Sequence, residues 1–473
     1  MSSIGSAQSY DLSATAIDPD DPAYRPLLQD LQGDILKPNG RLYATHVVFE
    51  FTGTEPEVRA WLSSLADRYL TSAAKQWDDA ARHRTENADA GLFGTLGLTA
   101  AAYQWLKFDL PHIPRDRQAR FIAGMADGST QAALNDPPIH CWEPWSRGTI
   151  HAVLNLFDNN PSTLDASVAL IRIEAAGKAN ILSVQPALRL RNAQGQTIEP
   201  FGFVDGVSQP LFVKSDIAAK PPAGSYDPAA PLSLVLIPDP NGAGPYSHGS
   251  FMVYRKLLQD VSNFHQEVAQ LAAKLNAPPE LAAAYTVGRF ADGTPVVLSD
   301  QPTGKNPPSN DFQFDMDSNA ARCPFQAHIR KANPRGDTVR SNNAPLEVER
   351  SHRIVRRAFA FQTAQPGGGT ETGLQFFCYQ SDIGNQFEFI QSAWLNMTHF
   401  LRMNTGLDGV IGQAAPKADC SRPDSPGGQH WPNAWGDAQK GTTTVDFGRW
   451  VSLRGGAYLF AASLSFFKGL AGH

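Results

Sequence analysis

Strand-like segments that are followed directly by amphipathic helices constrain the fold of this chain most strongly. RLYATHVVFEF (42–52) is rich in the β-branched and aromatic residues of a strand, and EPEVRAWLSSLADRYL (55–70) has the apolar spacing of an amphipathic helix. The strand-like TIHAVLNLF (149–157) is followed by the helical SVALIRIEAA (167–176). Strand–helix–strand units with short connections predict an α+β fold in which helices pack on antiparallel sheets.

The second half of the chain repeats this pattern. GSFMVYRKL (249–257) and GLQFFCYQ (373–380) have the composition of buried strands, and SLVLIP (233–238) is a further strand candidate. Apolar residues with helical spacing follow the first of them, at positions 257, 261, 264, 268, 271 and 275. The pattern is that of a duplicated α+β unit, and 473 residues suffice for two domains.

Long loops rich in Gly, Pro and Asp separate these elements, at 220–231, 238–249, 301–310 and 413–440. Loops of this length inside a compact domain usually have a function or cover a site. We expect the same here.

The charge of the chain excludes some classes of partner. A net charge of −6 and a pI near 6.1 argue against nucleic acid and against an anionic membrane. No run approaches the roughly 20 apolar residues that span a bilayer. The first residues lack a basic region followed by an apolar one, which predicts a cytoplasmic protein, with a secreted mature form as the alternative.

The cysteines predict neither a disulfide framework nor a zinc site. Cys141, Cys323, Cys378 and Cys420 are widely spaced and include no CxxC pair.

The segment GFVDGVSQP (202–210) places one carboxylate, Asp205, between two glycines. In one interpretation Asp205-Gly206 is a hairpin turn, because both residue types tolerate positive φ. In the other, the glycines let the backbone approach a flat ligand, and apolar neighbours hold the acid in a poorly solvated pocket. The segment alone favours the turn.

Two downstream segments concentrate basic residues. CPFQAHIRKANPR (323–335) contains His328, and SHRIVRRAFAF (351–361) contains three arginines. Their basic residues are Arg330, Lys331, Arg335, Arg353, Arg356 and Arg357. Taken singly, such residues are usually solvated or capped, although arginine clusters also hold carboxylates and phosphates.

Together the three segments resemble the dye-decolorizing peroxidases, a family of haem enzymes. The chain has the family's GxxDG pattern, then CPFxAHIRKxNPR, then RIxRR, in the family's order. The resemblance implies two ferredoxin-like α+β domains, with antiparallel sheets sandwiched with helices and haem mainly in the C-terminal domain. We expect an N-terminal arm over 1–25, a first domain over 26–195 and a haem-binding domain over 196–473.

The resemblance also implies haem b, held without covalent links because the chain has no CxxCH motif. His328 matches the proximal iron ligand, and Asp408 in TGLDGVIG matches the partner of its second ring nitrogen. Family members often have Pro where this chain has Gly409, so an ordinary Asp-Gly turn remains the alternative. Arg330 is a candidate contact for a haem propionate, or else a surface arginine.

On the opposite side of the haem, Asp205 and Arg356 match the family's catalytic pair. Asp205 would move a proton between the two oxygens of peroxide, and Arg356 would stabilise the negative charge of the departing oxygen. Arg356 is chosen over Arg353 and Arg357 because it comes first in the Arg-Arg pair. Leu374 and Phe376 alternate on one strand and match residues that roof the cavity, a role compatible with core packing.

Two further features of the resemblance concern substrates and pH. Trp394 matches a surface electron relay of some relatives, although apolar residues at 387, 390, 394, 397 and 401 also fit helix packing. Phe361 occupies the position of a second, tyrosine relay and lacks its phenol. An aspartate has a reference pKa of about 3.9, against about 6.5 for a histidine, so we expect an acidic optimum of about pH 3–5.

The sequence therefore predicts a haem peroxidase that reduces hydrogen peroxide and oxidises small one-electron donors such as dyes, phenols or Mn²⁺. The alternative is a haem-handling or iron-releasing protein with incidental peroxidase activity. A hydrolase built on Asp205 and His328 has no supporting serine elbow or metal pair.

Overall fold

The computed structural model describes residues 10–110, 115–219, 224–365 and 368–472. Its first unit is a four-stranded antiparallel sheet in the order β4-β1-β3-β2. The strands are β1 (Tyr43–Phe51), β2 (Phe93–Leu98), β3 (Ala152–Asp158) and β4 (Ala179–Leu188). Helix α2 (Glu55–Tyr69) follows β1 and helix α7 (Pro161–Ala175) follows β3, which gives the βαββαβ order of a ferredoxin-like unit.

The second unit repeats this topology in the order β14-β8-β11-β10. Its strands are β8 (His248–Gln259), β10 (Phe359–Ala364), β11 (Thr370–Gln380) and β14 (Val451–Ala461). Helix α9 (Val261–Leu275) follows β8, and the π-helical segments Gly384–Glu388 and Ile390–Leu395 follow β11. The duplicated α+β unit, and the two ferredoxin-like domains that the resemblance implied, are confirmed.

The two sheets join at both edges into a closed ring of strands. Leu98 of β2 pairs with Phe460 of β14, and Leu188 of β4 pairs with Ala360 of β10. Between the sheets, the His46 ring packs against Phe377, and its Nδ1 lies 3.0 Å from the amide oxygen of Asn155. Burial lowers the pKa of His46 to about 3, so this imidazole is a neutral core residue.

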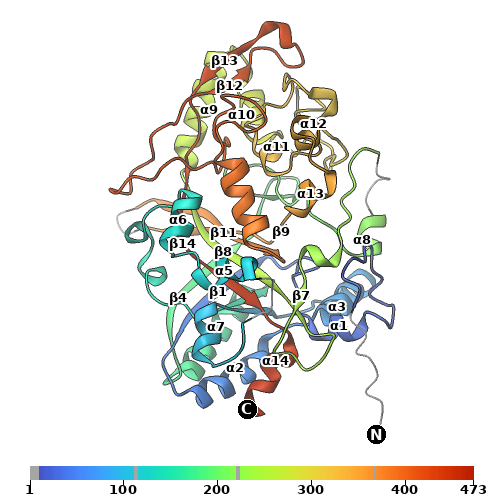
Figure 1. The fold of residues 1–473 in the computed structure, drawn as a ribbon, viewed down its shortest axis with the longest axis vertical. Helices are drawn as coiled ribbons and strands as arrows, with labels where there is room; N and C mark the ends of the chain where they lie inside the picture. The colour runs from blue at the N-terminus through green and yellow to red at the C-terminus, as the bar shows by residue number, and fades with distance from the viewer. Residues whose placement is uncertain (1–9, 111–114, 220–223, 366–367, 473) are drawn as a thin grey trace.

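The two units also exchange their terminal segments. In the N-terminal arm, Ile17 pairs in parallel with Val213 of the second half, and Ser233 donates its N–H to the Leu12 carbonyl. At the other end, α14 (Leu464–Gly469) packs on α2 of the first unit, as the red and blue helices at the bottom of Figure 1 show. The strands of the two sheets lie within 26–195 and 196–473, the ranges expected for the two domains.

Shorter elements surround the sheets, and those of the second unit fill the upper half of Figure 1. The remaining helices are α1 (Arg25–Asp30), α3 (Ala73–Glu86), α4 (Ala100–Trp105), α5 (Arg115–Ala123), α6 (Gly128–Leu134), α8 (Lys214–Ala218), α10 (Pro279–Val287), α11 (His328–Ala332), α12 (Asp337–Asn342) and α13 (Leu346–Ser351). The short strands are β5 (Leu190–Arg191), β6 (Thr197–Ile198), β7 (Ile237–Pro238), β9 (Val355–Arg356), β12 (Gln429–Pro432) and β13 (Thr442–Val445). Within the described residues, no helix is long and apolar enough to cross a membrane.

Two expected elements differ from the structure. The strand expected at 233–238 is mostly a 3₁₀ turn, Leu232–Leu234, with only the two residues of β7 paired. The helix expected around Trp394 is present, and it is a π-helix. The spacing of apolar residues alone does not distinguish a π-helix from an α-helix.

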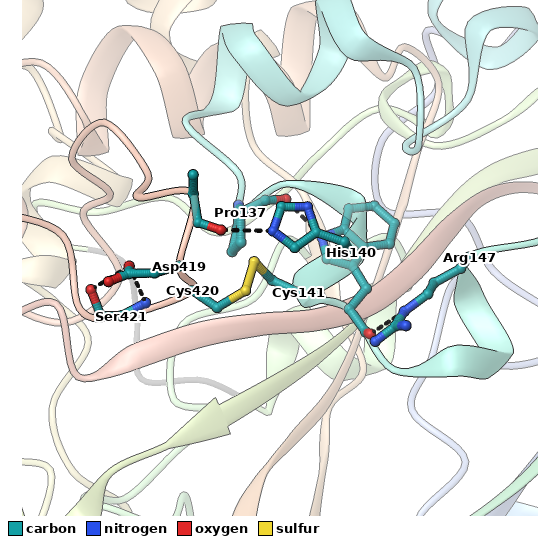
Figure 2. Close-up of a disulfide and its surroundings, with 9 residues drawn as sticks. Pro137, His140, Cys141, Arg147, Asp419, Cys420 and Ser421 are labelled. Carbon is teal, nitrogen blue, oxygen red and sulfur yellow. Dashed lines mark hydrogen bonds between the residues drawn. A yellow bond between two sulfur atoms is a disulfide. The ribbon is translucent and has the colours of Figure 1, made fainter.

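The structure contains one disulfide that the spacing of the cysteines does not indicate. Cys141 and Cys420 form a disulfide across a separation of 279 residues, which joins the first half of the chain to the long loop at 413–440 (Figure 2). Local spacing patterns such as CxxC cannot reveal a pair that only folding brings together. Cys323 and Cys378 are buried thiols.

A buried ion pair also connects the two halves. Arg255 on β8 donates two hydrogen bonds to the carboxylate of Asp136, and both side chains are almost completely buried. Removing one partner leaves an uncompensated buried charge, so Asp136→Ala should lower the free energy of unfolding by about 3 to 5 kcal/mol.

Urea unfolding checks this prediction. The double variant Asp136→Leu/Arg255→Met removes both charges and should recover most of the loss. A loss below about 1 kcal/mol in Asp136→Ala would contradict the assigned role of the pair.

Candidate active site

A cavity of about 250 Å³ lies against the sheet of the second unit. Apolar side chains from β8, β11, α10, α11 and the loop after Asp408 form much of its wall. The cavity brings together five residues that the sequence placed in the site, from segments up to 171 positions apart: Asp205, His328, Arg356, Leu374 and Phe376. Leu374 and Phe376 contribute apolar wall from alternate positions of β11.

His328 is the first residue of the short helix α11, and a carboxylate contacts its ring on the side away from the cavity. Its Nδ1 lies 3.1 Å from Oδ2 of Asp408, which is completely buried. Because a carboxylate accepts a proton donor, this contact places the ring hydrogen on Nδ1 and leaves the lone pair of Nε2 free. The structure thus brings Asp408 to His328, as the resemblance implied.

The Asp408 carboxylate is itself fixed. Its Oδ1 accepts the backbone N–H groups of Val410 at 2.9 Å and Ile411 at 2.7 Å. Burial alone would raise the pKa of Asp408, but its electrostatic interaction and hydrogen bond with His328, together with the Ile411 N–H, lower it. The arrangement is therefore an imidazole oriented by an anionic carboxylate.

Asp205 and Arg356 face the same cavity. Arg356 donates from Nη1 to Oδ1 of Asp205 at 3.4 Å and from Nη2 to the Ser208 carbonyl at 3.1 Å. About a third of each side chain is exposed, 30 % for Asp205 and 32 % for Arg356, so both present polar atoms to a ligand. Gly202 at φ +98° and Gly206 at φ +76° adopt backbone conformations that favour glycine on either side of the acid.

Arg330 does not reach the cavity, and the expected propionate contact is wrong. Its guanidinium is completely buried and donates to Asp317, Asp337 and the Cys323 carbonyl. Two residues along a helix correspond to a rotation of about 200°, so Arg330 points away from the face that carries His328.

Other arginines do reach the cavity. Arg289, Arg335 and Arg353 line the cavity together with Arg356. Burial lowers the pKa of Arg289 to about 9, helped by the nearby charges of Arg335 and Arg356, and lowers that of Arg335 to about 10. The Nη1 of Arg353 is buried and has no hydrogen-bond partner among the residues that the structure describes. This excess of positive charge fits an anionic ligand.

Glu199 is a residue of the cavity wall that the sequence reasoning missed. Its carboxyl oxygens accept the N–H groups of Phe201 and Phe203 at 2.9 and 3.0 Å, and an amide N–H of Gln259 at 2.8 Å. It thus closes the turn that leads to Asp205. Burial raises the pKa of Glu199 to about 7 despite these donors, and the charge of Asp205 adds to the rise. The available signal was a carboxylate just before a glycine-containing turn.

Trp394 does not lie on the surface. Only 7 % of the residue is exposed, and its ring packs edge-on against Phe389, His352 and Phe400. The expected surface position is therefore wrong, and the packing alternative describes Trp394 correctly.

Comparisons with known proteins agree with this geometry. The family model of the Dyp-type peroxidase C-terminal region matches residues 298–403. The multifunctional dye peroxidase DyP2 of Amycolatopsis is 34 % identical over 94 % of this chain and 96 % of its own length. The chain belongs to the dye-decolorizing peroxidase family. It is therefore a haem-dependent peroxidase.

Solved structures of dye-decolorizing peroxidases share the whole fold. The DyP-type peroxidase of Anabaena is 40 % identical, with a TM-score of 0.89 over 98 % of this chain and 100 % of that one. The structure of DyP2 from Amycolatopsis is 32 % identical, with a TM-score of 0.88 over 97 % and 100 %. Both units of this peroxidase are thus present in its relatives.

The raised pKa of Glu199 predicts a pH-dependent stability. In the folded protein the carboxyl keeps its proton up to about pH 7, whereas the ordinary value is 4.5. The folded state therefore binds more protons over this range, and its stability falls as pH rises towards 7. Glu199→Gln cannot ionise, so it should gain stability relative to wild type between pH 5 and 8, by up to about 3 kcal/mol.

Urea unfolding of the haem-free wild type and of haem-free Glu199→Gln, at pH 5 and at pH 8, measures the difference between their free energies of unfolding. A gap between the two proteins that does not change with pH would contradict the assigned protonation of Glu199.

Proposed function

We propose that the cavity is the haem site and that the protein reduces hydrogen peroxide to water while oxidising small one-electron donors. One observation carries this proposal. A carboxylate-backed imidazole, His328, and an acid–guanidinium pair, Asp205 and Arg356, line the same mostly apolar cavity. Peroxidase chemistry needs both parts, an axial iron ligand and groups that move a proton and stabilise charge.

The residues of the cavity fit haem b in four respects. The free Nε2 of His328 can bind iron, and the apolar wall suits the macrocycle. The two propionates match the excess of arginine, of which Arg335 and Arg353, with its unpartnered Nη1, are the proposed contacts. No cysteine is among the described residues that line the cavity, which supports non-covalent binding.

When bound, haem supplies the iron that activates peroxide and the electron-accepting centre for the donors. His328 would hold the iron, and Asp408, which fixes the orientation of the ring, would increase its electron donation. The buried hydrogen bond keeps the imidazole in one tautomer and one orientation.

Asp205 and Arg356 act on the peroxide. The Asp205 carboxylate would accept the proton of one peroxide oxygen and deliver it to the other, which leaves as water when the O–O bond breaks, with the two electrons for this cleavage supplied by the bound haem. Arg356 remains protonated and stabilises the negative charge that develops on the departing oxygen. Their contact of 3.4 Å holds the pair together and leaves Oδ2 of Asp205 free for substrate.

The reducing substrates are proposed from the relatives. Similar proteins are named as dye peroxidases, among them the Mycetinis scorodonius enzyme msp1, 31 % identical over 93 % of this chain and 86 % of its own length. We extend this to dyes and phenols, with Mn²⁺ as a further donor to be tested. A haem-handling protein would have no need of the Asp205–Arg356 pair, so the pair favours the enzyme.

Replacing the proposed iron ligand tests the cofactor. His328→Ala should remove the Soret band at about 400 nm from the purified protein, because the iron loses its ligand. His399→Ala, at an exposed histidine outside the cavity, should keep it. An unchanged spectrum of His328→Ala would overturn the assignment.

Replacing the acid–guanidinium pair tests the reaction. Asp205→Asn should slow the reaction with peroxide by about 10²- to 10⁴-fold, because the amide cannot accept a proton. Arg356→Leu should slow it by about 10²- to 10³-fold through lost charge stabilisation. Rapid-mixing absorbance of the haem band measures both rates, and dye oxidation by wild type should peak at about pH 3–5.

Arg350→Leu on α13 is the matched control, because Arg350 lies outside the cavity. It should react like wild type. Peroxide reduction that survives in both cavity variants would favour the haem-handling alternative.

A further inference from the structure

The disulfide links two segments of the chain, residues 135–141 of the first half and residues 408–420 of the loop that leaves the proposed haem site. We call the contact between these two segments the seam. Cys141 ends a 3₁₀ turn, Ile139–Cys141, and Cys420 lies in the loop after Asp408 (Figure 2). Neither the family resemblance nor the catalytic proposal gives this disulfide a role.

Hydrogen bonds follow the same seam towards the cavity. His140 Nε2 lies 2.7 Å from the Ala418 carbonyl, next to the disulfide. Further along, Gln413 accepts from Asn135 at its carbonyl and donates from its amide to Asp136. Hydrogen bonds therefore connect the two segments along the seam, and the disulfide links them covalently at its end.

The loop at the seam begins in the proposed haem site. Its first residue is Asp408, which orients His328, and Val410 and Ile411 line the cavity. Only twelve positions separate Asp408 from Cys420. The disulfide therefore fixes the far end of the segment that holds the proximal carboxylate.

The surroundings of the two sulfurs suit redox chemistry. Cys420 is exposed, so small reductants and peroxide can reach it. His140 is also exposed, and one of its ring nitrogens lies within 4.8 Å of both sulfurs. The Nε2 of His140 donates to the Ala418 carbonyl beside the disulfide (Figure 2). A protonated imidazole at this distance favours the thiolate of a nearby cysteine, which is the reactive form.

We propose that Cys141 and Cys420 form a reversible redox site, closed by the enzyme's own substrate, that retains haem by fixing the Asp408 loop. This inference rests on the proposed haem site. In the closing reaction, the Cys420 thiolate attacks hydrogen peroxide and becomes a sulfenic acid, with one water released after protonation. The Cys141 thiol then attacks that sulfur, and the second water leaves as the disulfide forms. A dithiol reductant reverses the result and is oxidised to its own disulfide.

Haem transfer to apomyoglobin, followed at the Soret band, tests the proposal on the holoenzyme. Reductant-treated wild type should lose haem roughly three- to tenfold faster than oxidised wild type. Hydrogen peroxide in molar excess over haem, added after removal of the reductant, should restore slow loss. Alkylation followed by mass spectrometry should find the label on Cys141 and Cys420 only, because Cys323 and Cys378 are buried.

Two variants provide the controls. Cys141→Ser/Cys420→Ser should lose haem quickly and respond neither to reductant nor to peroxide, which separates the disulfide from effects of reductant on iron. His140→Gln should keep slow haem loss but re-form the disulfide roughly three- to tenfold more slowly.

The outcomes distinguish this inference from the catalytic proposal. A normal Soret band with equal haem loss before and after reduction would overturn the redox site alone, as would labelled thiols that peroxide fails to re-oxidise. Absence of a Soret band in untreated protein would overturn both proposals.

Discussion

The hydrogen bond between the buried Asp408 carboxylate and His328 is the interaction on which the proposed site depends. It sets the tautomer of the imidazole, and so decides that Nε2 rather than Nδ1 faces the cavity. The carboxylate is held in turn by the N–H groups of Val410 and Ile411, so the loop backbone and the ligand are positioned together. Any movement of this loop is therefore transmitted to the imidazole.

Charge is distributed unevenly around the cavity, and this asymmetry gives the two sides different tasks. Arg289, Arg335 and Arg353 supply more positive charge than the surrounding acids balance, which prepares the cavity for an anionic cofactor. Asp205 and Arg356 form a loosely coupled pair whose polar atoms remain available. The proposed function thus assigns cofactor binding and catalysis to different arginines of one wall.

Much of the fold was predictable because its signals are local. Strand composition and helical stripes gave β1, α2, β8 and α9 close to their observed bounds. The order of the GxxDG, HIRK and RIxRR motifs identified Asp205, His328 and Arg356, which the structure brings to one cavity.

The features that the sequence did not predict depend on the direction of side chains and on contacts between distant segments. HIRKANPR contains several cations, and only the helix geometry shows that Arg330 turns towards Asp317 while Arg335, beyond the end of α11, returns to the cavity. The Cys141–Cys420 pair leaves no local pattern at all. The role of Glu199 follows from backbone N–H groups, which no residue pattern displays.

The exchange of terminal segments between the units has a consequence for synthesis. Strand β2 of the first unit finds its outer neighbour only in β14, and α2 is covered by α14, at the very end of the described chain. The first unit therefore has an open sheet edge and an uncovered apolar helix face until β14 and α14 have been synthesised. Protection of that nascent surface is a requirement that this architecture places on the cell.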